Sequence, residues 1–267
     1  MSSEERKKRR EERAQKLRLK QEAALKKAHE EEAKANEATA EAKRKEAIPG
    51  EMSAKGYNIS AEQLSNGQFS TVFKAKYNDE DIAVRIIEKE GKEDNFLKRL
   101  VPRFVRILRI LDERHPNIVS TLDVFETSKR ILIPMRLTPN GSLYDFIDKQ
   151  TEPMKEDLCK KWCQQLISAI TYLHINGIVH RDLRSERILL DGNNSLKITG
   201  FTFSRLWMNA KDNSKSLANT CVGTGPYCAP ETLTGESYDP RTADVWAFGV
   251  IVFYIWNKRF SFHINYQ

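Results

Sequence analysis

Hydrophobic and polar residues follow one pattern before residue 50 and another after it. Residues 3–47 consist almost wholly of Glu, Lys, Arg, Ala, Gln and Leu, which favour helix, and Pro49-Gly50 ends this pattern. The positions that would face a partner helix, three or four residues apart, are mostly alanine with polar interruptions. They offer too little apolar surface to indicate a coiled coil. The pattern predicts a charged, helical and partly disordered arm over residues 1–50, stabilised by Glu–Lys pairs. A solvated helix and a helix that binds a partner weakly are both open interpretations.

From residue 55 onward the chain contains short stretches rich in β-branched and aromatic residues, separated by polar turns. Five such stretches predict a five-stranded antiparallel sheet, with strands at 57–64, 72–77, 81–87, 122–127 and 130–136. A helix is expected over 94–114, between the third and fourth strands, and it should end before His115-Pro116.

After Asn140-Gly141 the spacing of the apolar residues becomes helical. One helix is predicted to stop at Gly177 and to bury a single face, formed by Leu158, Trp162, Leu166, Ala169, Ile170 and Leu173. Residues 245–256 are apolar all round, which predicts a helix buried inside the body of the protein. A sheet-rich part followed by a helical part predicts an α+β fold.

Charge separates the same two regions as the hydrophobic pattern. The chain of 267 residues carries 44 Lys and Arg against 37 Asp and Glu, a net charge of +7. The first 50 residues hold 15 of the basic and 11 of the acidic residues, so the remainder has the composition of an ordinary globular domain. We therefore divide the chain into the arm at 1–50 and a domain at 55–267, whose sheet-rich part is 55–138 and whose helical part is 139–267.

Composition also excludes several classes of protein. The longest apolar run, 245–256, is shorter than the roughly 18 residues that a membrane helix needs, and no apolar stretch follows the basic N-terminus. We therefore expect no membrane segment and no secretory signal. The four cysteines lack metal-ligand spacing, which favours reduced thiols in the cytoplasm, with the nucleus as the alternative. Glutamates flank the basic run at residues 6–10 and dilute its field, so we do not expect nucleic-acid binding.

Three motifs in a fixed order carry the strongest signal for function. They are His180-Arg181-Asp182-Leu183, Cys228-Ala229-Pro230-Glu231 and the run Asp244-Val245-Trp246-Ala247-Phe248-Gly249. Together they resemble the catalytic loop, the end of the activation segment and the start of the central helix of eukaryotic protein kinases. Residues 64–72 look like the glycine-rich loop of that family, and 82–85 look like its β3 lysine motif. The region from Phe96 to Phe104 looks like the αC helix region of the testis-specific serine/threonine kinases.

The resemblance covers about residues 57–267 and implies a bilobal fold with a five-stranded N-lobe and a helical C-lobe. The last helices of the family have no counterpart before Gln267, so the C-lobe is expected to be incomplete. Its buried central helix should then expose an apolar patch. Two explanations of the incomplete C-lobe are open: the chain is truncated, or a partner protein covers the apolar patch.

The resemblance also assigns candidate site residues. Asp182 is the expected proton acceptor for a substrate hydroxyl. ATP binding is implied by seven further positions, of which Arg85 replaces the β3 lysine and Met135 is the gatekeeper: Leu64, Gly67, Val72, Ala83, Arg85, Met135 and Leu189. For the apolar members of this set, an ordinary core role is the alternative. Thr220 matches an activation-segment threonine, either phosphorylated beside Arg181 or unmodified.

The resemblance implies that four catalytic positions of the family are altered in this chain. The β3 lysine falls on Arg85, the glutamate that pairs with it on Phe104, the metal-binding aspartate on Gly200 and the catalytic-loop asparagine on Arg187. The loop lysine falls on Arg184. An arginine 4 Å from Mg²⁺ would be repelled by roughly 8 kcal/mol at an effective dielectric constant of 20. We therefore expect no Mg²⁺ and no other metal in this site.

These features leave three functions open. The first is a pseudokinase that binds or scaffolds protein partners and retains metal-independent nucleotide binding. The second is an active but atypical ATP-dependent serine/threonine kinase, in which Arg85 and Arg187 hold the phosphates. The third is a helical interaction protein that works through residues 1–50.

Overall fold

The computed structural model describes residues 52–67, 69–92, 96–111, 115–208, 214–220 and 222–259. The chain divides into two compact units, Met1–Ala61 and Glu62–Gln267. In the first unit the described residues form a helical turn at 52–53 and the beginning of strand β1 (Tyr57–Asn66), which continues into the second unit. The helical arm predicted over residues 1–50, with its proposed interaction function, lies outside the described residues.

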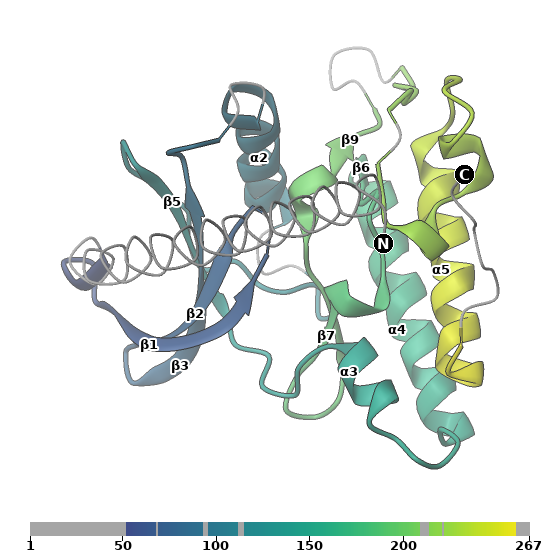
Figure 1. Ribbon diagram of the computed structural model, residues 1–267, viewed down its shortest axis with the longest axis horizontal. Helices are drawn as coiled ribbons and strands as arrows, with labels where there is room; N and C mark the ends of the chain where they lie inside the picture. Colours follow the sequence, from purple (N-terminus) through teal and green to yellow (C-terminus); the bar gives the residue numbers. More distant parts are fainter. Residues whose placement is uncertain are drawn as a thin grey trace, which may run out of the picture. The chain divides into compact units, whose positions relative to one another are not determined.

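The predicted five-stranded sheet is confirmed (Figure 1). Its order is β1-β2-β3-β5-β4, in which β2 is Thr71–Tyr77, β3 is Glu80–Glu88, β4 is Phe125–Glu126 and β5 is Arg130–Arg136. The pairings β2–β3, β3–β5 and β4–β5 are antiparallel. Asn78 and Asp79 both have positive φ, 49° and 64°, which gives the tight turn that a two-residue hairpin requires.

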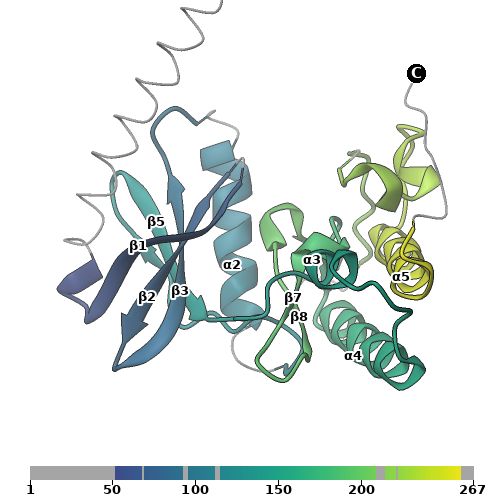
Figure 2. The ribbon, with the colours of Figure 1, turned by 60° about the horizontal axis from the view of Figure 1, so that its bottom comes forward.

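The helix expected over 94–114 is only partly α-helical. Residues Val101–Leu111 form α2, and the preceding Phe96–Leu100 form a π-helical turn, η1. Pro102 has no backbone N–H, so it cannot donate the α-helical hydrogen bond to the turn before it, and the α-helix begins one residue earlier. The buried face of α2 consists of Val101, Phe104, Ile107, Leu108 and Leu111. Figure 2 shows α2 between the sheet and the β7–β8 hairpin.

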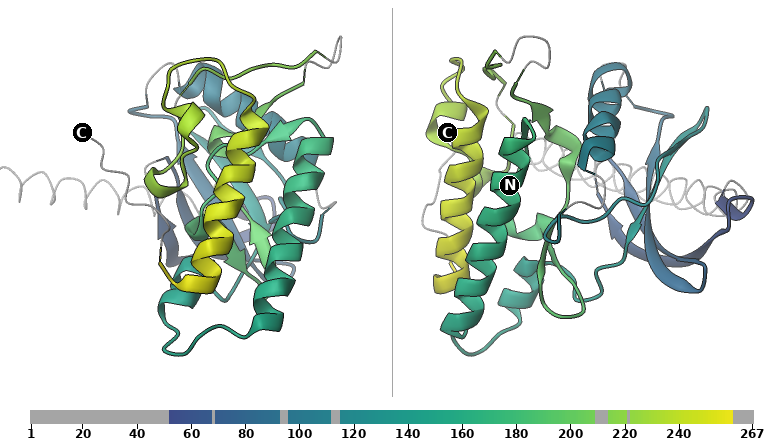
Figure 3. Two further views of the ribbon diagram at one scale, coloured as in Figure 1. Left: turned by 90° about the vertical axis from the view of Figure 1, so that its right-hand side faces the viewer. Right: turned by 180° about the vertical axis from the view of Figure 1, so that it is seen from behind.

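The helical part contains α3 (Leu143–Asp148), α4 (Glu156–Ile175) and α5 (Pro240–Asn257). Two small antiparallel pairs join them, β6 (Ile178–Val179) with β9 (Arg205–Leu206) and β7 (Ile188–Leu190) with β8 (Leu196–Ile198). Four short 3-10 turns complete the connections: η2 (Ser185–Arg187), η3 (Phe201–Phe203), η4 (Gly225–Tyr227) and η5 (Pro230–Thr232). Helices α4 and α5 lie side by side (Figure 3), and the α+β class is confirmed.

The two long helices differ in how well the sequence predicted their burial. On α4, five of the six predicted face residues are buried, while Leu158 is half-buried against the same core. Helix α5 is buried on one side only, because Val245 and Trp256 are 57% and 46% exposed. The prediction of a helix buried all round was therefore wrong for its outer face. Among the described residues, no helix is long and apolar enough to cross a membrane.

Candidate active site

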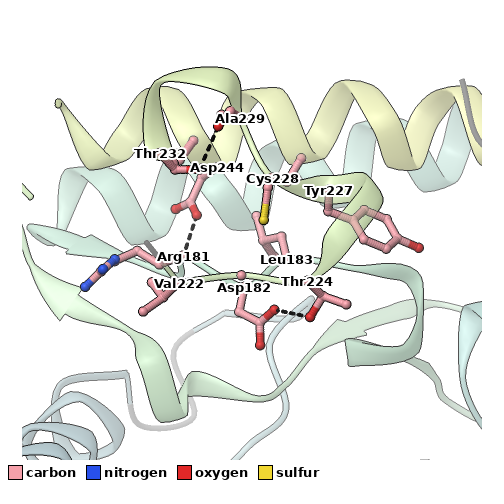
Figure 4. Close-up of a pocket in the computed structure, with 13 residues that line it drawn as sticks. Arg181, Asp182, Leu183, Val222, Thr224, Tyr227, Cys228, Ala229, Thr232 and Asp244 are labelled. Atoms are coloured by element: carbon pink, nitrogen blue, oxygen red, sulfur yellow. Dashed lines mark hydrogen bonds between the residues drawn. The ribbon is translucent and has the colours of Figure 1, made fainter. Parts of the chain in front are cut away.

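The loop that follows β6 is held in place by one buried carboxylate. Asp244, at the start of α5, accepts hydrogen bonds from the backbone N–H of His180 at 2.8 Å and of Arg181 at 2.7 Å. His174 lies 3.0 Å from the same carboxylate. Arg181 has a φ of +67°, a left-handed conformation that a non-glycine residue adopts only when its surroundings impose it. The Asp244 contacts supply that constraint and fix the position of Asp182 (Figure 4).

Both carboxylate oxygens of Asp182 are occupied by donors from this chain. Its Oδ2 lies 2.5 Å from Nη2 of Arg187. Its Oδ1 accepts from the hydroxyl of Thr224 at 2.9 Å, a contact that Figure 4 shows. Arg187 is fixed a second time, because its Nη1 donates to the carbonyl of Gly200 at 2.6 Å. The expected proton acceptor is therefore buried in an internal ion pair.

Gly200 and Arg187 fill one space between them. A Cβ atom at position 200 would lie 2.6 Å from Cδ and 2.9 Å from Nη1 of Arg187, closer than non-bonded atoms approach. The guanidinium therefore takes up the volume into which a side chain at position 200 would project. Gly200 also has a φ of +88°, where few residues other than glycine sit without strain.

Arg85 points into a small cavity that has no acidic side chain. Its Nη2 donates to the hydroxyl of Thr199 at 3.3 Å, and its Nε is shielded from solvent without a partner in the described part of the chain. The cavity has a volume of about 20 Å³ and is also lined by Phe104, which stands where the sequence analysis places the lost glutamate. Burial, followed by the positive charge of Arg187, lowers the pKa of Arg85 to about 10.

The loop after β1 folds onto the same region. The Gly67 N–H donates to the carbonyl of Ser70 at 3.0 Å. The ring of Phe69 meets that of Phe203 edge to face at 5.6 Å, and the guanidinium of Arg187 lies 5.9 Å from the same Phe203 ring. The Phe203 ring therefore lies near both Phe69 and the guanidinium of Arg187.

The apolar candidates are spread over both parts of the domain. Ala83 and Met135 face each other in register on β3 and β5, and both are buried. Val72 on β2 and Leu189 on β7 are half-buried against the core, whereas Leu64 on β1 is 41% exposed. The structure thus brings Ala83 and Met135 together and leaves Leu64 at the surface. Their assignment to an adenine site stays a prediction.

Thr220 contacts Arg181, one of a second cluster of arginines formed by Arg103, Arg181 and Arg205. Arg181 donates through Nη2 to the hydroxyl of Thr220 at 2.5 Å and to its carbonyl at 3.0 Å. Burial, followed by the charges of Arg181 and Arg205, lowers the pKa of Arg103. The sequence motifs predict the contact of Thr220 with Arg181 but not the roles of Arg103, Arg205 and Thr224. These residues lie outside the motifs, and only the fold brings them to this region.

The residues at the implied metal position do not fit a divalent cation. Within the described ranges, no group of three His, Cys, Asp or Glu side chains could hold a metal ion. Gly200 offers no carboxylate, and the carboxylate of Asp182 already holds the guanidinium of Arg187. A divalent cation at this carboxylate would lie close to that guanidinium and be repelled by it.

Comparison with known proteins gives one clear family. The model of the protein kinase domain matches residues 59–267. CBL-interacting serine/threonine-protein kinase 16 of Arabidopsis thaliana is 35% identical over 206 residues, which cover 74% of this chain and 43% of that protein. Testis-specific serine/threonine-protein kinase 1 of Mus musculus is 36% identical over 203 residues, covering 74% and 54%. The chain spans about half the length of the curated relatives it matches.

Proposed function

The chain belongs to the protein kinase domain family, and from this premise we propose that it is a pseudokinase, a kinase domain that binds other molecules without transferring phosphate. The proposal is carried by one observation, the capture of Asp182 by Arg187 at 2.5 Å. The relatives are serine/threonine kinases, so the fold is inherited from enzymes of that class. Fold alone does not decide activity, which depends on the groups present in the site.

Phosphoryl transfer relies on positioning and on neutralising charge, and each of these requirements is altered here. A substrate hydroxyl needs a carboxylate that can take up its proton, but Asp182 is paired with the guanidinium of Arg187, which stabilises its charged form. The phosphates need a metal, but position 200 carries no side chain. The β3 cation needs a carboxylate partner, but Phe104 is apolar and 2% exposed.

As a binding module, the domain has an apolar surface on its helical part. Val245 and Trp256 of α5 are exposed, and Ile167 of the neighbouring α4 is 50% exposed. We propose that a protein partner binds at these exposed apolar side chains.

One observation favours the alternative of an active, atypical kinase. Asp182 is retained, and the Asp244 network that positions its loop is intact. If Arg187 could swing away from Asp182, that carboxylate would be free to accept a proton.

A phosphate-transfer assay separates the two functions. The purified full chain is incubated with radiolabelled ATP, a general protein substrate and Mg²⁺ or Mn²⁺, beside the variant Asp182→Ala. The pseudokinase account expects the same background labelling from both proteins. Transfer by the wild type that is lost in Asp182→Ala would establish the active kinase instead.

A further inference from the structure

A groove lies between helix α2 and the edge of the sheet at β4. Residues of α2 line it together with Lys89, which directly follows β3, and Glu126 of β4. Its volume is about 480 Å³, whereas the cavities beside Arg85 and Asp182 measure about 20 Å³ and 10 Å³. Clefts that bind ligands typically enclose roughly 300–1,000 Å³. The groove shares no lining residue with either smaller cavity, so it is a separate site.

Helix α2 gives this groove an accessible apolar lining. Pro102 is exposed, while Val105 and Ile110 are half-buried against the core, so part of each apolar side chain can be reached from the groove. Pro102, Val105, Arg106 and Arg109 follow the spacing i, i+3, i+4 and i+7, which places them on one face of the helix. Apolar and basic side chains therefore lie next to each other along the groove.

The two arginines on this face carry charges that the described chain does not neutralise. Arg106 and Arg109 are exposed, and neither guanidinium forms an ion pair or a hydrogen bond with another described residue. The one carboxylate among the described residues that line the groove, that of Glu126, lies 2.8 Å from Nζ of Lys89. Its charge is compensated there, so the groove keeps the two positive charges of the arginines.

We infer that this groove binds an acidic segment of a protein partner, in which carboxylates flank a large apolar side chain. The apolar side chain packs against Val105 and Ile110, and the flanking carboxylates pair with Arg106 and Arg109. Arginine suits this role, because its planar guanidinium can donate two parallel hydrogen bonds to one carboxylate. The inference goes beyond the proposed function, since this surface does not depend on whether the chain transfers phosphate.

Other anionic occupants match the groove less well. The acidic stretch of this chain's own arm, residues 30–41, has alanine as its only apolar residue type and so offers no side chain that could fill the apolar part. An anionic membrane presents charge at its head groups and keeps its apolar chains beneath them. A protein segment can place an apolar side chain directly between two carboxylates, as the alternation along α2 requires.

Fluorescence anisotropy of labelled peptides, titrated with the full chain, tests the inference. The probe is the peptide Asp-Glu-Asp-Phe-Phe-Glu-Asp-Glu. One comparison peptide has alanine in place of both phenylalanines, and the other has lysine in place of every acidic residue. We expect the probe to bind with a Kd below about 100 μM, the alanine peptide at least tenfold more weakly, and the lysine peptide not at all. Raising NaCl from about 0.05 M to about 0.5 M should weaken probe binding about tenfold, because salt screens exposed charges.

Substitutions on α2 locate the binding site. Arg106→Glu combined with Arg109→Glu should weaken probe binding at least tenfold and create binding of the lysine peptide, without changing the melting temperature of the exposed helix face. Lys155→Glu combined with Lys161→Glu is the matched control, because it makes the same change of net charge at two exposed lysines in the helical part and should leave binding unchanged. Val105→Thr keeps the shape of the side chain but makes it polar, so it should weaken binding severalfold.

Several results would overturn the inference. Equal binding of the probe and the alanine peptide, or an equal loss in the lysine control, would show only unspecific attraction between charges. Probe affinity unchanged by the two arginine substitutions would place the binding elsewhere. A synthetic peptide of residues 28–42 that binds as tightly as the probe would assign the groove to the chain's own arm.

Vesicles containing phosphatidylserine provide the remaining comparison. Vesicle binding that the two arginine substitutions abolish, without binding of the probe, would assign the surface to a membrane and overturn the inference. The absence of all binding would overturn it as well. These outcomes leave the pseudokinase proposal intact, because the phosphate-transfer assay tests that proposal separately.

Discussion

The guanidinium of Arg187 lies 2.5 Å from the carboxylate of Asp182, in the loop where the family has its proton acceptor. The same guanidinium fills the space beside Gly200. Two departures from the family pattern, 13 residues apart, are therefore one structural change. The arginine needs the glycine for room, and in the pseudokinase proposal the carboxylate missing at position 200 and the arginine beside it both disfavour a metal ion.

Because Arg187 and Gly200 share one space, we predict that an aspartate cannot be introduced at position 200 without also changing Arg187. Gly200→Asp should destabilise the protein by about 1–3 kcal/mol, because its Cβ overlaps Arg187. Adding Arg187→Asn should recover the part of that loss that comes from the overlap, though not the strain of a non-glycine residue at a φ of +88°, and create a site that Mg²⁺ stabilises. Thermal denaturation with and without Mg²⁺ measures both effects.

The matched control for the restored site is Arg187→Asn combined with Gly200→Asn, which has the same shape without the carboxylate. It should show no shift with Mg²⁺. If Gly200→Asp by itself were as stable as the wild type, the two residues would not compete for one space.

Removing Arg187 should destabilise the protein, because it leaves the buried carboxylate of Asp182 unpaired. Arg187→Met is expected to lower the free energy of unfolding by about 3 kcal/mol, since breaking a buried ion pair leaves one charge uncompensated. Asp182→Asn in the same background should restore much of the loss. Urea denaturation at pH 7 measures these differences, and a loss below about 1 kcal/mol would show that the pair is not buried.

We expect the folded protein to lose stability at acidic pH because of His180. Its Nδ1 accepts from the N–H of Asp182 and its Nε2 contacts the Thr199 carbonyl, an arrangement that needs the neutral ring. Burial, the largest effect, lowers the pKa of His180 from 6.5. The unfolded chain therefore binds more protons, and this stabilisation is complete above pH 6.5 and declines below it.

The expected slope from this one group is at most about 1.4 kcal/mol per pH unit. Its titration can be followed directly by nuclear magnetic resonance of the imidazole ring. A midpoint at or above 6.5 would contradict the buried, neutral state.

Thr220 contacts Arg181 of the cluster Arg103, Arg181 and Arg205, which predicts that a negative charge at position 220 is stabilising. Thr220→Glu should raise the free energy of unfolding by up to about 1 kcal/mol relative to Thr220→Gln, because Thr220 is exposed and solvent screens the charge. The same comparison in an Arg181→Met background should show a smaller difference. Equal stability of Thr220→Glu and Thr220→Gln would show that the cluster exerts no attraction at this position.

The sequence predicted the sheet and the two long helices because local patterns determine them. Alternating β-branched residues defined β2, β3 and β5, and apolar spacing identified α4. The outer face of α5 could not be predicted, since its sequence is apolar on every side and only neighbouring elements decide which side is covered. The π-helical turn before α2 depends on one proline and has no periodic signal.

The candidate site was predictable residue by residue but not as an arrangement. The motifs located Asp182, Arg187 and Gly200 and showed which charges had changed. They could not show that Arg187 contacts both other residues, because this depends on side-chain reach across the fold. The contact of Thr224 with Asp182 joins residues 42 positions apart and follows from no local pattern.

The most direct test of the pseudokinase account is the ratio of phosphate transfer by the wild-type chain to that by Asp182→Ala. It should be measured at saturating ATP with both Mg²⁺ and Mn²⁺. The capture of Asp182 by Arg187 predicts a ratio of about one, since removing an occupied carboxylate removes no catalysis. A ratio of ten or more would mean that Asp182 accepts a proton from substrate and that the chain is an active kinase.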